Sequence, residues 1–211
     1  MNFPAYYIVL SIAFIVSLVF YKKIKPAYFR LCCPYLLMNL VVETYGIISK
    51  SQGKSNYWIY NISTTIEFGF YFFIFYINLT NQNVRRYIVW VSILFFPFCF
   101  INIFFIQGIN HFHSITFLAG SFFLICLSVL YFQDQIIKEN EFLKNPLKEK
   151  MFWIATGVLF FYSVGFFNLG LFEIIHVHNS LLKTVTDLLL NLLNIFLYCT
   201  FIIAFLIGND K

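Results

Sequence analysis

Apolar residues fill seven long stretches of the chain, and short polar segments separate one stretch from the next. A helix needs roughly 20 apolar residues to cross a bilayer, and each stretch is about that long. The predicted spans are residues about 4–21, 30–48, 57–79, 87–106, 114–132, 151–173 and 184–207. The stretches lack the alternation of apolar and polar positions that barrel strands require. The sequence therefore predicts one all-α domain over residues 1–211, a polytopic membrane protein with seven transmembrane helices.

The composition and the placement of charge agree with a lipid environment. Hydrophobic residues make up 61% of the chain and charged residues only 11%, whereas about a quarter of a soluble domain is charged. The connections after the first, third and fifth spans, together with the C-terminal tail, hold 11 of the 14 Lys and Arg residues. Cytoplasmic loops are enriched in these residues, so we expect an N-out, C-in topology in the cell inner membrane. The net charge of +5 is then a topology signal, and no direct nucleic-acid partner is expected.

Polar residues gather on one face of three predicted helices. Because each residue turns a helix by about 100°, positions three and four apart share a face. The faces comprise Asn39 and Glu43 in the second span, Asn61, Glu67 and Tyr71 in the third, and Asp187, Asn191, Asn194 and Tyr198 in the last. Lipid cannot satisfy such groups. We therefore expect these residues to line one ligand or ion pocket in the outer half of the bundle.

Glu67 is the acidic residue predicted to lie nearest the middle of the bilayer. An ionised carboxylate there costs about 2.5–3.5 kcal/mol even on insertion scales, and no Lys or Arg lies at its predicted depth. We expect Glu67 to be protonated, hydrogen-bonded to Asn191 or Asn194, or paired with a bound cation. Each option is typical of a proton or cation site, or of an acid that donates to a ligand. The alternative is that these polar groups only hold helices together, at roughly 0.6 kcal/mol per hydrogen bond.

Two histidine pairs, His111 with His113 and His176 with His178, fall in segments predicted to lie at the outer surface. Together with Glu173 they suit Zn²⁺ if these loops are extended, because residues two apart point away from each other on a helix. Histidines solvated at the membrane interface are the alternative. A metal here is therefore a hypothesis, and no cofactor is predicted.

The longest polar stretch of the chain is the predicted cytoplasmic connection 133–150, with the sequence QDQIIKENEFLKNPLKEK. Together with the loop 22–30 it offers a cytoplasmic surface on which a separate protein could dock. A solvated helical connector is the alternative interpretation. The sequence leaves the oligomeric state open.

Three stretches, YNISTTIEFGFY, FFIQGINHFHSITFLAGSFFLICLSVLYF and FWIATGVLFFYSVGFF, resemble those of small seven-span inner-membrane proteins of the Bacteroidota. The layout is also similar to the membrane modules of seven-span sensor kinases. The second resemblance implies a role in signalling. No kinase or dimerisation helix follows the last span, so we expect any signal to pass through a separate protein.

Three functional classes fit these patterns. The first hypothesis is a sensor, receptor-like or accessory signalling protein with a polar pocket in its outer half. The first alternative is a small proton- or cation-coupled carrier, and the second is a membrane effector or pore accessory to a nucleic-acid-sensing defence system such as type VI CRISPR. An enzyme is not indicated, because the sequence contains no GxSxG, HExxH or phosphate-loop motif.

Overall fold

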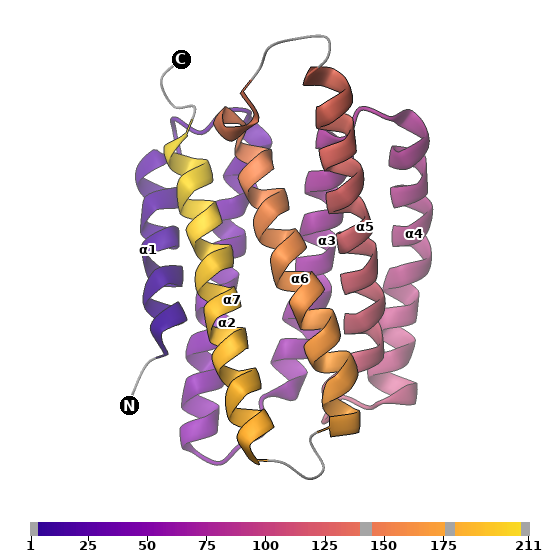
Figure 1. The fold of residues 1–211 in the computed structure, drawn as a ribbon. Coiled ribbons are helices and arrows are strands. Elements are labelled where there is room, and N and C mark those ends of the chain that lie inside the picture. Colours follow the sequence, from indigo (N-terminus) through magenta and orange to yellow (C-terminus); the bar gives the residue numbers. More distant parts are fainter. Residues whose placement is uncertain (1–3, 140–144, 176–179, 208–211) are drawn as a thin grey trace.

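The structure, a computed structural model, describes residues 4–139, 145–175 and 180–207, and the side chains of residues 4–136, 145–168 and 184–207. Within these ranges the chain forms seven long helices and no strand (Figure 1). The helices are α1 (Ala5–Phe20), α2 (Cys32–Ser51), α3 (Tyr57–Asn78), α4 (Gln82–Ile101), α5 (Ser114–Glu139), α6 (Lys150–Ile175) and α7 (Ser180–Leu206). Short helical turns cover Ala27–Leu31, Asn102–Ile106 and Pro146–Lys148. The all-α prediction is confirmed for this part of the chain.

Length and apolarity identify a membrane protein. Five helical segments are long and apolar enough to cross a bilayer, namely Ala27–Ser51, Gln82–Ile106, Ser114–Ile136, Lys150–Asn168 and Thr184–Leu206. α1 is apolar but shorter, and α3 carries the polar run NISTTIE in its first half. Large apolar side chains face outward, among them Val19, Leu94 and Phe105, which are 69%, 71% and 77% exposed. Soluble monomers rarely expose such surface, so the chain is a helical, multi-pass membrane protein.

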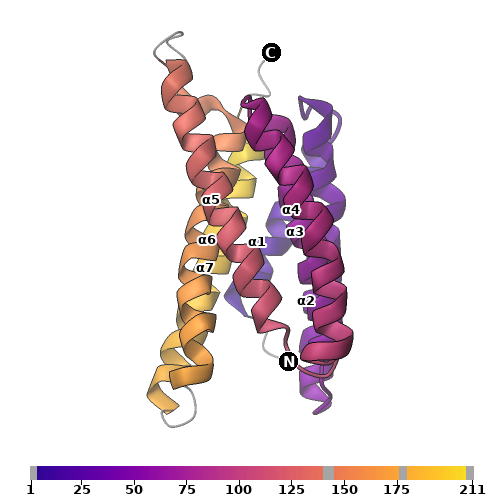
Figure 2. The same cartoon turned by 90° about the vertical axis from the view of Figure 1, so that its right-hand side faces the viewer.

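Consecutive helices run in opposite directions, and the bundle has two layers. α2, α3 and α4 form one layer and α5, α6 and α7 the other, as Figure 2 shows from the side. α1 packs against both α2 and α7, and α3 packs against α5. The space between the layers is therefore lined by α2 and α3 on one side and by α6 and α7 on the other.

Two helix ends differ from the predicted apolar windows. α4 begins at Gln82, ahead of the predicted start near 87, because the Asn81 side chain accepts hydrogen bonds from two backbone N–H groups of the first turn. α5 continues to Glu139, beyond the predicted end near 132, so the first part of the connection 133–150 is helical. Asp134 in this extension accepts hydrogen bonds from the Thr80 backbone N–H at 2.9 Å and from the Thr80 hydroxyl. A search for apolar stretches does not detect helix ends that are made of polar residues.

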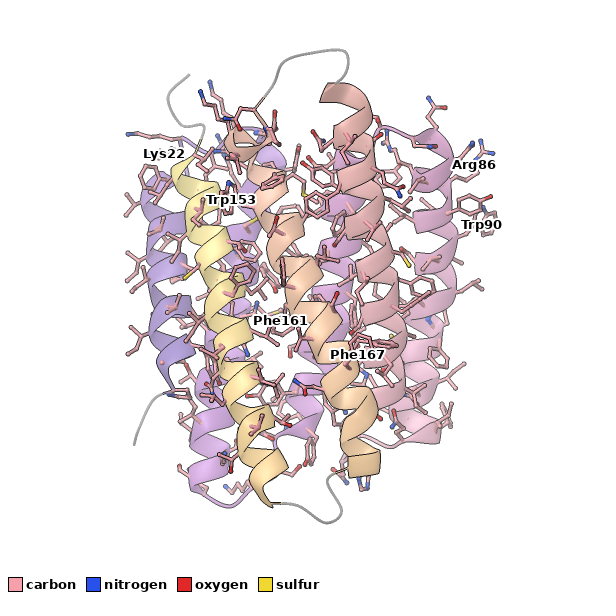
Figure 3. The ribbon with its side chains drawn as sticks, viewed as in Figure 1. Lys22, Arg86, Trp90, Trp153, Phe161 and Phe167 are labelled. Carbon is pink, nitrogen blue, oxygen red and sulfur yellow. The ribbon has the colours of Figure 1, made fainter. Side chains whose placement is uncertain are left out.

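The loops that are rich in Lys and Arg lie together at one end of the bundle, called the basic end. The α1–α2, α3–α4 and α5–α6 connections lie there, as does the end of α7 (Figure 1). Lys22 and Arg86 mark this end in Figure 3. The basic residues with described side chains at this end are Lys22, Lys23, Lys25, Arg30, Arg85, Arg86, Lys148 and Lys150. Among described side chains, the opposite end carries Lys50 and Lys54.

Candidate functional site

Glu67 lies near the middle of α3, at the end of a chain of tyrosine hydroxyls. The Tyr35 hydroxyl of α2 donates a hydrogen bond to Glu67 Oε1 at 2.8 Å. The hydroxyls of Tyr35 and Tyr71 are 2.9 Å apart. Because a tyrosine has a single O–H donor, Tyr71 donates to Tyr35 when Tyr35 donates to Glu67. The Tyr35 ring also stacks on Phe70 with centroids 4.1 Å apart, which fixes the orientation of the donor.

Two further tyrosines reach Glu67 from the other helix layer. Tyr162 of α6 is fully buried, and its ring meets Tyr71 edge-on with centroids 5.9 Å apart. The Tyr162 hydroxyl faces the Glu67 carboxyl without meeting hydrogen-bond geometry, and it has no other partner among the described residues. Tyr198 of α7 is buried and lies within electrostatic reach of both Glu67 and Glu43. The two layers therefore meet at Glu67 through tyrosine side chains.

Glu43 of α2 has a tyrosine shell of its own. Its Oε2 atom accepts hydrogen bonds from the Tyr6 hydroxyl at 2.7 Å and from the Tyr60 hydroxyl at 3.1 Å. Tyr60 reaches the carboxyl by lying against Gly46, where a Cβ atom would collide with the Tyr60 hydroxyl. A side chain at position 46 would therefore displace one of the two donors. The residue type at this position is set by the contact with Tyr60.

Together these residues form what we call the glutamate–tyrosine centre. It comprises Tyr6 of α1, Tyr35 and Glu43 of α2, Tyr60, Glu67 and Tyr71 of α3, Tyr162 of α6 and Tyr198 of α7. Glu43 and Glu67 act on each other electrostatically. Both residues are half-buried, and fully buried tyrosines adjoin them. The sequence has no Lys or Arg at positions 31–49 or 55–84. α3 therefore has no basic residue, and the one in α2, Lys50, lies two helical turns beyond Glu43.

Asn39 and Asn61 were predicted to line the same pocket, and the structure places them differently. Asn39 lies one helical turn from Glu43 and is half-buried, and its Nδ2 atom is buried with no partner in the described chain. Asn61 is fully buried and lies near the N-terminal end of α3. Its Nδ2 donates to the His111 carbonyl at 2.8 Å, and its Oδ1 accepts from the His113 backbone N–H at 3.1 Å. Asn61 therefore fixes the α4–α5 connection to α3.

The polar residues predicted on one face of α7 also occupy different surroundings. Tyr198 joins the glutamate–tyrosine centre, whereas Asp187 is exposed. The amide groups of Asn191 and Asn194 donate to carbonyls of their own helix, those of Asp187 at 2.8 Å and Leu190 at 2.9 Å. The hydrogen bond expected between Glu67 and one of these two asparagines is thus made by Tyr35 instead.

The histidines with described side chains occupy two different environments. His111 is exposed, whereas His113 is fully buried at the start of α5, where its Nδ1 atom bonds Thr116 and its Nε2 atom has no partner among the described residues. Burial lowers the pKa of His113 to about 4, so the ring is neutral at neutral pH. No group of three potential metal ligands occurs among the described residues. His176 and His178 lie outside them, and the zinc hypothesis stays a prediction.

Four members of the centre were absent from the pocket predicted from the sequence: Tyr6, Tyr35, Tyr60 and Tyr162. Each is one of 14 tyrosines, a residue equally common at membrane interfaces. A weak signal existed for Tyr60, because it directly precedes the polar run that contains Glu67. Nothing in the sequence distinguishes Tyr162 from an interfacial tyrosine.

No family model, curated protein or solved structure matches this chain. The chemistry of the centre is therefore taken from its own groups. Two carboxyls bordered by hydroxyl donors and aromatic rings suit a proton or a positively charged ligand, because carboxylate oxygens and aromatic faces both attract cations.

Proposed function

We propose that the chain is a seven-span, N-out, C-in protein of the cell inner membrane that acts as a receptor-like sensor. In this proposal a proton or a cationic ligand binds at the glutamate–tyrosine centre, and the bound state is passed to a separate cytoplasmic protein. The observation that carries the proposal is the pair of half-buried glutamates, Glu43 and Glu67, with tyrosines of five helices around them.

Electrostatics favours a positive ligand. Two carboxylates within reach of each other repel when both are ionised, and the repulsion is stronger away from bulk water. A proton or cation placed at either group relieves it. The tyrosine hydroxyls that now bond Glu43 and Glu67 would then rearrange, because a protonated or cation-bound carboxyl accepts fewer hydrogen bonds.

Sensing follows from the number of helices tied to the centre. A ligand shifts a conformational equilibrium when it binds one state better than another. Rearranged tyrosines on α1, α2, α3, α6 and α7 would change how these helices pack. The basic end, with the loop 22–30 and the described part of 133–150, offers the surface proposed for the partner. The 11-to-3 division of Lys and Arg between the two sets of connections supports placing that end in the cytoplasm.

A second candidate is a proton- or cation-coupled carrier. It is favoured by the neighbours of Glu67, because Tyr35 of α2 and Tyr162 of α6 belong to the two different helix layers seen in Figure 2. Carriers bind substrates and coupling ions near the bilayer midplane, between bundles that move against each other. The effector alternative gains no support from the residues that the structure describes.

Thermal unfolding of the purified protein tests the proposal. We expect Na⁺, K⁺, tetramethylammonium or a lower pH to raise the Tm of the wild type but not of Glu67→Gln. A ligand at 100 times its Kd would add about 2.7 kcal/mol. Glu149→Gln removes an exposed carboxyl at the basic end and is the matched control. Equal responses of all three proteins would contradict the proposal.

Flux measurements separate the two candidates. A sensor reconstituted into proteoliposomes should bind the cation without accumulating it. Uptake that Glu67→Gln abolishes and Glu149→Gln retains would select the carrier.

A further inference from the structure

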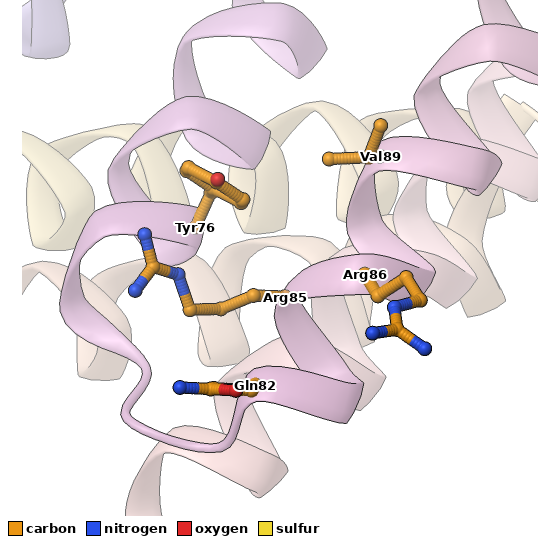
Figure 4. Close-up of a pocket in the computed structure, with 5 residues that line it drawn as sticks. All are labelled: Tyr76, Gln82, Arg85, Arg86 and Val89. Atoms are coloured by element: carbon orange, nitrogen blue, oxygen red, sulfur yellow. The ribbon is translucent and has the colours of Figure 1, made fainter.

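A pocket lined by basic residues lies at the basic end, away from the glutamate–tyrosine centre. It has a volume of about 420 Å³ and lies between the end of α3 and the first turns of α4 (Figure 4). Its lining consists of Tyr76, Gln82, Arg85, Arg86 and Val89. Two arginines and an amide thus face a cavity that carries no acidic residue in its lining.

Arg85 is held in place by an aromatic contact. Its guanidinium carbon lies 4.5 Å from the centre of the Tyr76 ring, close enough for a cation–π interaction. Figure 4 shows Arg85 reaching toward Tyr76, with Arg86 on the other flank of the helix. The Arg85 Nε atom is buried and has no hydrogen-bond partner among the described residues. A buried donor of this kind calls for an acceptor.

The arginine side chains, rather than the helix terminus, supply the donors. The Asn81 side chain already accepts from the Asn83 and Val84 N–H groups at 2.9 and 3.4 Å, so these amides are engaged. A planar guanidinium matches two oxygens of a phosphate group. The chemistry of the pocket therefore points to a phosphate-bearing ligand.

The surface next to the pocket is apolar and faces outward. Val89, Trp90 and Ile93 of α4 are 44%, 59% and 54% exposed, and Phe73 of α3 is 41% exposed. Trp90 stands outward from α4 one turn beyond Arg86 (Figure 3), at the kind of depth where tryptophan marks the membrane interface. A ligand that fills this pocket and covers this surface needs an anionic head and apolar chains.

We propose that the pocket binds the headgroup of an anionic phospholipid, with Arg85 and Arg86 on the phosphate and the acyl chains along Val89 and Ile93. In the proposed topology the basic end lies at the cytoplasmic leaflet. The anionic lipids of that leaflet attract Lys and Arg side chains near its surface. A soluble phosphate compound has the same head chemistry but would leave the apolar surface uncovered.

Lipid retention measured by native mass spectrometry tests this site. The wild type in detergent should retain phosphatidylglycerol in preference to phosphatidylcholine. Arg85→Gln and Arg86→Gln should each weaken retention about 5-fold, and the double variant about 30-fold, since a basic residue near an anionic surface contributes on the order of 1 kcal/mol. Lys22→Gln with Lys23→Gln removes the same charge from the same end outside the pocket, and it should retain lipid as the wild type does.

A second arm distinguishes the source of the phosphate. Inorganic phosphate and glycerol phosphate, at concentrations matched to the lipid, should leave the Tm unchanged. Phosphatidylglycerol should raise the Tm of the wild type and of the lysine control, and should raise that of the arginine variants less. Stabilisation by the soluble compounds would assign the pocket to a soluble anion and overturn the lipid proposal. Equal loss of lipid in the lysine control, or no loss in the arginine variants, would also overturn it.

Discussion

Two neighbouring residues of α3, Glu67 and Phe68, point about 100° apart around the helix and enter regions built in different ways, although both adjoin Tyr162. Glu67 enters the glutamate–tyrosine centre, where the Tyr162 hydroxyl faces its carboxyl without meeting hydrogen-bond geometry with any described residue. Phe68 is fully buried, with ring centroids 5.4 Å from Phe95 and 6.1 Å from Phe117. Helix packing in a bilayer depends on close contact rather than on exclusion of water. The Phe68 side is therefore expected to hold the bundle together, and the Glu67 side to respond to a ligand.

The largest effect expected is a loss of stability on the Phe68 side. Phe68→Ala should lower the free energy of unfolding by about 3–5 kcal/mol, because it opens a cavity among three helices. Phe73→Ala, on the lipid-facing side of the same helix and 41% exposed, is the control and should change little. Thermal unfolding in detergent measures both. A Phe68→Ala protein as stable as Phe73→Ala would contradict the claim that packing around Phe68 holds the bundle together.

The pH response of the buried histidine must be separated from that of the centre. The pKa of His113 is lowered by burial from 6.5 to about 4, so the unfolded chain takes up the proton first as the pH falls. Its contribution is present above about 6.5 and is lost as the pH drops toward 4, by up to about 3 kcal/mol. His113→Gln should flatten the dependence of Tm on pH in this window. Identical curves for the two proteins would show that His113 does not titrate as described.

Substitutions at Glu67 test the glutamate–tyrosine centre, where smaller changes in stability are expected. Glu67→Leu should cost about 1–3 kcal/mol, because the buried Tyr35 hydroxyl loses its acceptor. Glu67→Gln keeps an acceptor oxygen and should be nearly as stable as the wild type while losing the response to cations. If the Glu67→Leu and Glu67→Gln proteins were equally stable, the hydrogen bond from Tyr35 would not stabilise the fold.

The smallest effect on stability is expected at the Tyr162 hydroxyl, which meets hydrogen-bond geometry with none of the described residues. Tyr162→Phe keeps the ring contact with Tyr71 and should change stability by less than about 0.5 kcal/mol. Tyr35→Phe removes a hydroxyl with two hydrogen bonds and should cost about 1 kcal/mol or more. If Tyr162→Phe weakens cation stabilisation without altering the unliganded Tm, the hydroxyl serves the ligand. A large loss of unliganded stability would assign it to the fold instead.

The sequence predicted the helices well because a bilayer imposes long apolar runs that are visible in one dimension. The inward polar face of α3 was also predictable, since Asn61, Glu67 and Tyr71 share one face of the helix. The expected hydrogen bond from α7 to Glu67 is not made, because the amide N–H groups of Asn191 and Asn194 donate to carbonyls on the preceding turn of their own helix. A short polar side chain can always bond its own backbone in this way. Tyr6 and Tyr162 were not predicted as site residues, because a tyrosine at a membrane interface and a tyrosine beside a buried carboxyl look the same in the sequence.

The central claim is that Glu67 binds a proton or a cation. Infrared difference spectroscopy of the protein in lipid measures it directly, because protonated and ionised carboxyls absorb at different frequencies. Adding the cation that stabilises the wild type, or changing the pH, should alter a carboxyl band that is missing in Glu67→Gln and kept in Glu149→Gln. A spectrum in which no carboxyl band responds, or in which the responding band persists in Glu67→Gln, would contradict the account.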